Sequence, residues 1–264
     1  MQEELKALLS PEEWARIRYY EVVGSTNTEA KALAAQGAPH GTVLIADCQT
    51  GGRGRLGRSF ASPSGKGVYL SMILRPQVPA EQLMHLTCWA GVTACDAIEK
   101  ATGLCPKIKW INDLICENRK IGGILTELGF DGGANAAYAV VGIGINCLER
   151  PEDFPPAVAK MAGSLTMFTD SPVSRAQVAA SLIQSLNRAF PSLLSQKEAL
   201  MTRYRSLCLT LGREVQILSL AGPRRGTALD VTEDGALLVR FPDGHQEAVS
   251  AGEVSVRGMY GYSV

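Results

Sequence analysis

The segment that most strongly indicates chemistry is a run rich in glycine and arginine at residues 49–58, QTGGRGRLGR. Its glycines permit unusual backbone angles and bring backbone N–H groups close to a ligand. Its three arginines present planar cationic forks that suit carboxylate and phosphate oxygens. The run therefore predicts a loop that binds an oxygen-rich anion, with phosphate as the default. A flexible solvated loop and a basic element that touches nucleic acid are the alternatives at this point, and neither the dinucleotide nor the Walker fingerprint matches.

Three further segments combine side chains that packing alone does not explain. Residues 109–113 (KWIND) place a cation, an aromatic ring, an amide and a carboxylate at a predicted strand edge. Lys120 stands directly before residues 121–123 (IGG), as a cation beside glycines that allow close approach; a solvated turn lysine is the alternative. Residues 142–146 (GIGIN) end an apolar strand, and because glycines weaken a strand, a ligand or a neighbouring backbone is expected to come close there.

Other polar positions carry weaker signals. Residues 25–28 (STNT) offer free N–H donors and hydroxyls at a helix start, which suits a polar ligand. A plain N-cap needs no ligand, and this segment alone favours that interpretation. His40, His85 and His245 lack carboxylate or cysteine neighbours at ligand spacing, so no metal site built from a protein ligand cluster is predicted. Neither the G-x-S-x-G nor the H-E-x-x-H motif of hydrolases is present.

Hydrophobic periodicity and end signals predict the elements that position these segments. A capping Ser10 with Pro11 and Glu13 begins a first short helix. Strands are expected at 17–23, 43–47, 68–74, 107–110, 113–118, 120–128 and 137–147. Helices are expected at about 26–37, 79–103, 174–190 and 196–208, with Gly103 closing the second of these four.

The predicted secondary structure changes near residue 211, from mixed hairpins and helices to short strands, and this change predicts two domains. Residues 1–211 mix hairpins with helices, which favours an α+β domain with a mixed sheet. Residues 212–264 contain short alternating strands separated by turn signals at 222–223, 234–235 and 242–244. Strands at this spacing predict a small C-terminal β-barrel.

Composition excludes several broad classes. Lys plus Arg and Asp plus Glu both number 26, so the chain as a whole has no electrostatic bias toward nucleic acid or membrane. The cysteines number seven and form no C-x-x-C pair, which indicates reduced thiols rather than a disulfide or zinc framework. The acidic N-terminus lacks a signal-peptide layout, and no apolar run reaches the ~20 residues of a membrane helix. We therefore expect a soluble cytoplasmic protein.

Taken together, the motifs resemble those of the biotin–protein ligases, also called biotin–[acetyl-CoA-carboxylase] ligases. The family pattern runs Ser-Thr-Asn, Gln-x-x-Gly-Arg-Gly-Arg-x-Gly-Arg, Lys-Trp-Pro-Asn-Asp, Lys-x-x-Gly-Ile-Leu and Gly-Ile-Asn. The five motifs are found in this chain, in the same order, at residues 25–27, 49–58, 109–113, 120–125 and 144–146. The match covers about residues 15–150, with Ile111 where the family usually has proline and Phe60 where some members have tryptophan.

The resemblance also implies the architecture. It predicts a mixed sheet with helices of the class II aminoacyl-tRNA synthetase/biotin synthetase-like type, plus an SH3-like β-barrel at the C-terminus. Regulatory members carry a winged helix–turn–helix domain before the Ser-Thr-Asn motif, and only 24 residues precede Ser25 here. We therefore expect the monofunctional type, which lacks the N-terminal DNA-binding domain and does not bind DNA.

The resemblance implies a reaction in two steps. The biotin carboxylate attacks the α-phosphate of ATP, which gives biotinyl-5′-AMP and pyrophosphate. A lysine of a biotin carboxyl carrier domain then attacks this mixed anhydride and releases AMP. ATP and Mg²⁺ are thus the expected co-substrate and its metal, biotin is the substrate, and a homodimer is left open.

The resemblance assigns roles to individual residues. The catalytic residues implied are Arg55, Lys120 and Asp113. The biotin contacts implied are Ser25, Thr26, Asn27, Gln49, Gly52, Arg53, Gly54, Arg55, Trp110, Lys120 and Gly123. The nucleotide contacts implied are Arg55, Arg58, Lys109, Asn112 and Asn146. Asp113 has several open roles, which are orienting the acceptor lysine, accepting its proton, or helping to hold Mg²⁺, and we take the action on the lysine as the hypothesis.

Three alternative functions would require different sequence features. A lipoate–protein ligase or octanoyl transferase shares the general architecture, but the Gly-Arg-Gly-Arg loop is typical of the biotin branch. A nucleic-acid-binding regulator is disfavoured by the zero net charge and by the absence of a helix–turn–helix pattern. A noncatalytic biotin-binding or scaffold protein is disfavoured because Arg55 and Lys120 are both retained.

Overall fold

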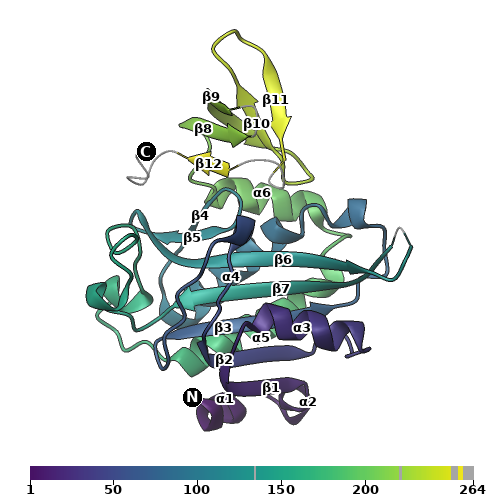
Figure 1. The fold of residues 1–264 in the computed structure, drawn as a ribbon, viewed down its shortest axis with the longest axis vertical. Helices are drawn as coiled ribbons and strands as arrows, with labels where there is room; N and C mark the ends of the chain where they lie inside the picture. The colour runs from purple at the N-terminus through teal and green to yellow at the C-terminus, as the bar shows by residue number, and fades with distance from the viewer. Residues whose placement is uncertain (134, 220–221, 251–254, 258–264) are drawn as a thin grey trace.

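The computed structural model describes residues 1–133, 135–219, 222–250 and 255–257, which form a larger and a smaller sheet with flanking helices (Figure 1). Across the larger sheet the described strands follow the order β1 (Ile17–Val23), β2 (Val43–Gln49), β3 (Gly67–Leu74), β7 (Ala136–Asn146), β6 (Arg119–Phe130), β5 (Asp113–Cys116) and β4 (Lys107–Lys109). β1 and β2 are parallel, and the remaining neighbours are antiparallel. This confirms the predicted mixed sheet.

Helices cover both faces of the larger sheet. α3 (Thr26–Ala35) lies on one face, while α4 (Leu86–Thr102) and α5 (Arg175–Ala189) lie on the other, with α6 (Lys197–Leu207) packed against α4 (Figure 1). The two faces follow from the two-residue period of a strand: Val43 and Ile45 join the large core with α4 and α5, whereas Leu44 joins a small core beneath α3. α1 (Gln2–Leu8) and α2 (Pro11–Ala15) lie near β1, at the sheet edge.

The end signals were correct at some positions and wrong at others. Ser10 and Glu13 form the predicted capping box, and Gly103 ends α4 with a φ of 74°. The predicted helix 79–103 begins later, at Leu86, because Ala80–Leu83 form a short 3₁₀ turn. The sequence hid this break because Leu83 is buried like the helical residues that follow it. Further 3₁₀ turns lie at η1 (Arg55–Gly57), η3 (Pro151–Asp153), η4 (Leu165–Met167) and η5 (Phe190–Ser192).

The C-terminal strands form an antiparallel sheet beyond α6 (Figure 1). Their order in the described residues is β11 (Gln246–Val249), β10 (Leu237–Arg240), β9 (Gly222–Val231), β8 (Glu214–Ser219) and β12 (Ser255–Arg257). The turn predicted at residues 222–223 is wrong, because these residues already pair with β8. The SH3-like barrel stays a prediction, since parts of this segment lie outside the described residues. In the described chain, no helix has both the length and the apolar character to cross a membrane.

Candidate functional site

A cavity of about 270 Å³ opens beside the start of α3, over β6 and β7. It collects residues from motifs that are far apart in the sequence. Of the predicted site residues, those that line it are Ser25, Thr26, Asn27, Gln49, Arg53, Gly54, Arg55, Arg58, Lys109, Trp110, Asn112, Asp113, Lys120, Gly123 and Asn146. The fold therefore brings the separate motifs to a common space.

Hydrogen bonds from Gln49 hold the start of α3 in the cavity wall. Thr26 donates to Oε1 of Gln49 from its backbone N–H at 2.8 Å and from its hydroxyl at 3.1 Å. The amide nitrogen of Gln49 donates to Oγ of Ser62 at 2.9 Å. The side chain of Ser25 makes no capping hydrogen bond to the described helix. Ser25 therefore occupies the predicted N-cap position without a side-chain cap, and the distant Gln49 accepts from the backbone N–H of Thr26, the first residue of the helix.

Asn27 anchors α3 to the sheet. Its amide nitrogen donates to the Leu125 carbonyl at 3.2 Å and to Oε2 of Glu127 at 2.9 Å, while Ser71 donates to its Oδ1 at 2.6 Å. A Cβ on Gly142 would lie only 1.9 Å from that same Oδ1. The glycine is therefore required for the close approach of Asn27.

The side chain of Phe60 covers Gly144, the next glycine along β7. A Cβ on Gly144 would lie 2.6 Å from the Phe60 ring, so the ring lies directly on the glycine backbone. Gly142 and Gly144 alternate with Ile143 and Ile145, which are buried in the large core. Residues 142–146 do have close neighbours, but these are the side chains of Asn27 and Phe60 and not the predicted ligand or backbone.

Lys120 and Asp113 form an ion pair in the cavity wall. The ammonium of Lys120 lies 2.5 Å from Oδ1 of Asp113, and both side chains are partly buried. A Cβ on Gly123 would lie 3.4 Å from Nζ of Lys120, which confirms a cation beside a close-approach glycine. The Lys120 backbone donates to the Met161 carbonyl at 2.7 Å and accepts from Gly163 at 2.9 Å. The lysine is thus held at both its backbone and its ammonium group.

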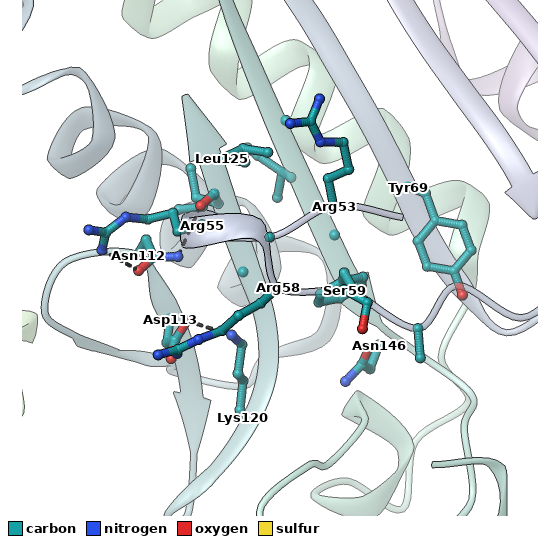
Figure 2. A pocket seen from close by; sticks show the side chains of 18 of the residues that line it. Arg53, Arg55, Arg58, Ser59, Tyr69, Asn112, Asp113, Lys120, Leu125 and Asn146 are labelled. Atoms are coloured by element: carbon teal, nitrogen blue, oxygen red, sulfur yellow. Dashed lines mark hydrogen bonds and ion pairs between the residues drawn. The ribbon is translucent and has the colours of Figure 1, made fainter. Parts of the chain in front are cut away.

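The three loop arginines lie in different environments (Figure 2). Arg55 donates to Oδ1 of Asn112 at 3.1 Å, and burial lowers its pKa, although the nearby Asp113 carboxylate opposes this shift. Since a guanidinium remains protonated in proteins, Arg55 stays a cation in the wall. Figure 2 shows Arg58 extending toward Asp113 and Lys120, whereas Arg53 points away from them. Arg55, Arg58 and Lys120 therefore make one end of the cavity cationic.

The rest of the KWIND and GIGIN motifs is buried. Lys109 and Trp110 are 7% and 5% exposed, so both side chains are buried. The Trp110–Ile111 peptide bond is cis. Asn146 is 6% exposed, and its amide nitrogen donates to the Gly163 carbonyl at 2.9 Å. These residues are thus held by the protein at the cavity wall.

Residues 49–62 form a folded hairpin-like loop. Gln49 bridges Ser62, and Arg53 bridges Ser59. Gly52 differs from its predicted place: it packs against the returning half of the loop, where a Cβ would lie 2.3 Å from the Phe60 carbonyl, and it is not among the cavity-lining residues. A biotin contact of Gly52 stays a prediction.

Ligand binding is expected to protect this loop from proteolysis. Arg53 and Arg58 are exposed, so trypsin should cleave the ligand-free protein between residues 49 and 67. Biotin with MgATP should slow this cleavage about tenfold, because we expect the loop to order over the ligand. Limited trypsin digestion followed by mass spectrometry measures the rate, with cleavage after exposed Arg225 as the internal control. Equal cleavage rates with and without ligands would contradict a closing loop.

The segment 154–162 contains no predicted site residue, yet it forms part of the cavity wall. Phe154, Val158, Met161 and Ala162 all line the cavity. Their spacing places apolar residues on one face of a helical turn, which is the signal that could have revealed them. Tyr69 also lines the cavity, and burial raises its pKa well above its usual value. The cavity thus has apolar wall residues in addition to its charged groups, and the apolar segment is bonded to the backbone of Lys120.

Comparisons with known proteins match both parts of the chain. The model of the biotin/lipoate A/B protein ligase family matches residues 19–146, and the model of the biotin protein ligase C terminal domain matches residues 210–257. A bifunctional ligase/repressor BirA of Bacillus subtilis is 33% identical over 88% of this chain and 72% of its own length. A biotin–[acetyl-CoA-carboxylase] ligase of Mycobacterium tuberculosis is 31% identical over 91% of this chain and 89% of its own.

A solved structure is similar along nearly the whole chain. It is a biotin protein ligase from Aquifex aeolicus in complex with biotin and ATP, with a TM-score of 0.77 and 30% sequence identity. The similarity covers 92% of this chain and 99% of that protein. The likeness therefore extends over both the larger and the smaller sheet.

Proposed function

Because this chain belongs to the biotin protein ligases of the biotin/lipoate A/B protein ligase family, we propose that it activates biotin with ATP and transfers it to protein lysine. It is an ATP-dependent ligase whose ligands are biotin and ATP. The first step forms biotinyl-5′-AMP and pyrophosphate, and the second forms an amide with the acceptor lysine and releases AMP.

The observation that carries this proposal is the order of side chains along β6 and β7. Asn27 lies over Gly142 and Thr26 lines the same part of the cavity, Lys120 lies over Gly123, and Asn146 follows at the strand end. Neutral hydrogen-bonding groups are thus followed by a cation and then by an amide beside an apolar wall. Biotinyl-adenylate has the same order, with a neutral ureido ring, a reacting carboxyl and phosphate, and a nucleoside. This order supports biotin at the α3 end and nucleotide at the Asn146 end.

The cationic groups supply what the first step requires. A carboxylate that attacks a phosphate brings two anions together, so the main task of the protein is to neutralise charge and align the reactants. Lys120 and Arg55 are held in the wall, and Arg58 extends toward Lys120. We propose that Lys120 binds the biotin carboxylate and that Arg55 and Arg58 bind the phosphate oxygens.

We propose that Mg²⁺ enters with ATP as part of the co-substrate. The described residues contain no cluster of three or more His, Cys, Asp or Glu side chains that would hold a metal by themselves. Among the described lining residues, Asp113 supplies the carboxylate. A hard cation that arrives on phosphate needs only one or two such protein oxygens. A contact to the metal of MgATP is thus the alternative role of Asp113, whose proposed role is on the acceptor lysine.

Asp113→Asn is expected to slow biotin transfer about 100-fold, measured from purified biotinyl-5′-AMP to a biotin carboxyl carrier domain. An acceptor lysine has an unperturbed pKa of about 10.4 and must lose a proton before it attacks, and the Asp113 carboxylate is suited to orient it or take that proton. Asp153→Asn breaks a comparable pair with Lys66 outside the cavity and should transfer at the normal rate. Full transfer by Asp113→Asn together with impaired adenylate synthesis would contradict this role.

Further aspects of the proposal concern partners and organisation. We propose a biotin carboxyl carrier domain of a carboxylase as the acceptor, which follows from the ligase activity. The seven free cysteines, five of them buried, support a cytoplasmic location. We propose a catalytic unit of residues 1–211 and a C-terminal unit of residues 212–264, supported by the start of the second sheet at Glu214.

Pyrophosphate release tests the proposed function directly. Purified protein with MgATP should release pyrophosphate when biotin is added, and should not do so with lipoate or octanoate. Pyrophosphate release with lipoate alone would instead identify a lipoate-type ligase. Failure to form any biotinyl-adenylate would contradict the proposal.

A further inference from the structure

The C-terminal sheet reaches the candidate site through Trp110. The indole Nε1 of Trp110 donates to the carbonyl oxygen of Gly235 at 2.9 Å, in the turn between β9 and β10. The backbone N–H of Trp110 donates to the hydroxyl of Thr210 at 2.9 Å, directly after α6. Trp110 is one of the residues that line the cavity. Both N–H groups of a cavity-wall residue are therefore bonded to the part of the chain that follows α6.

The β9–β10 turn is itself held on α6. Lys197 lies 2.5 Å from Oδ1 of Asp234, and Arg205 lies 2.6 Å from Oε1 of Glu233. Arg205 also donates to the Val231 carbonyl at 2.9 Å. Two residues of one helix thus hold the turn before Gly235 and present its carbonyl at a defined position.

Gly235 fits this position in two ways. Its φ of +84° is one that side chains other than that of glycine rarely allow. A Cβ there would lie 3.0 Å from Sγ of Cys88 and 3.5 Å from Cδ1 of Ile111, so the turn packs closely on α4 and on the KWIND segment. Gly244 has nearly the same φ, +89°, but a Cβ there would meet nothing within 4 Å. A comparison of alanine substitutions at Gly235 and Gly244 can therefore separate the effect of backbone strain from the effect of contact with the site.

We propose that the β9–β10 turn and Thr210 are positioning elements of the active site, which act by fixing the Trp110 ring in the cavity wall. A buried indole N–H is stable only with an acceptor, so the ring keeps its orientation while the turn is docked. Trp110 also precedes Asn112, which accepts from Arg55, so a shift of the ring moves the groups proposed to bind the substrates. This inference rests on the proposed function and gives the C-terminal unit a part in it.

The test compares Gly235→Ala with its matched control, Gly244→Ala. Gly235→Ala should raise the KM for biotin or ATP about five- to tenfold, with kcat per active site changed less than twofold. Gly244→Ala carries the same backbone strain without the contact, and its KM values should stay within twofold of normal. A purely structural role would reduce the number of active sites and leave KM unchanged. Normal KM values for folded Gly235→Ala would overturn the proposal.

A double-mutant cycle tests the individual hydrogen bond. Trp110→Phe keeps an aromatic ring but removes the indole N–H, and should raise KM to a similar extent. If both variants break one contact, the double variant should be no worse than either single variant. If the KM increases of the two single variants multiply in the double variant, the assignment of this hydrogen bond is overturned.

Thr210 provides an independent test if Gly235→Ala does not fold. Thr210→Val removes the acceptor of the Trp110 backbone N–H and should raise KM, whereas Thr210→Ser should restore it. Equal KM values for the two variants would count against the proposal. Tryptophan emission gives a readout that does not need activity: with Trp14 and Trp89 changed to Phe, Gly235→Ala should shift the Trp110 spectrum and Gly244→Ala should not. A wild-type enzyme without adenylate synthesis would refute the proposed function, whereas unchanged emission would refute this inference.

Discussion

Lys120→Gln is expected to lower the rate of biotinyl-adenylate synthesis roughly 100- to 1,000-fold, the range seen when one preorganised electrostatic group is removed from an active site. The ammonium of Lys120 lies over Gly123 and pairs with Asp113 in the cavity wall. Glutamine keeps similar length and polarity but carries no charge to offset the carboxylate and phosphate as they approach. Biotin-dependent exchange of pyrophosphate into ATP measures this step without any acceptor protein.

Lys66→Gln is the matched control for Lys120→Gln. Lys66 pairs with Asp153 at 2.9 Å, and the side chains are 33% and 26% exposed, close to the 29% and 19% of Lys120 and Asp113. Neither Lys66 nor Asp153 lines the cavity. Since partly exposed ion pairs contribute little to stability, both variants should fold normally. Exchange by Lys120→Gln at the rate of Lys66→Gln would exclude a catalytic role for Lys120.

Arg55→Gly is expected to increase the escape of biotinyl-5′-AMP about 10- to 150-fold. Arg55 is partly buried, bonds Asn112 and forms part of the loop over the cavity, so its removal opens the wall and deletes a charged contact. A hydrogen bond to a charged group is worth ~1.5–3 kcal/mol, which corresponds to this change in dissociation. The measurement is the dissociation rate of the adenylate synthesised on the enzyme, followed by rapid filtration.

Leu56→Gly separates the lost charge from the added backbone freedom. Leu56 is 59% exposed and has a φ of 55°, so glycine at this position relaxes the loop without removing a cation. Its adenylate should escape at a rate near normal. If Leu56→Gly releases the adenylate as fast as Arg55→Gly, loop mobility and not the guanidinium controls retention.

Several elements of the site could be predicted because their signals are local. The glycines of residues 142–146 indicated a close approach, since a strand with missing side chains needs a neighbour to fill the space. Lys120 beside residues 121–123 indicated a cation on a glycine surface in the same way. The capping box of Ser10 and Glu13 depends on residues three apart, so the sequence contained all of it.

Other elements could not be predicted because their partners are distant in the sequence. Ser25 is the N-cap of α3 as expected, but the bonds from Thr26 to Gln49 join segments that are distant in the sequence. The apolar residues at 154–162 have a helical spacing, but no motif there marks a ligand, and only the fold places them beside Lys120. Gly52 shows the same limit, because whether a loop glycine faces a ligand or the loop itself depends on how the loop folds back.

Residue type, spacing and periodicity are properties of short segments, so they were enough to indicate the class of chemistry and the kinds of secondary structure. The tertiary structure alone decided that Lys120 pairs with Asp113, that Phe60 lies on Gly144, and that Trp110 bonds Gly235. Such contacts depend on strand register and on the packing of turns and helices that the chain brings together only when it folds. Short segments of the sequence therefore identified the reacting groups, whereas the whole fold set their positions.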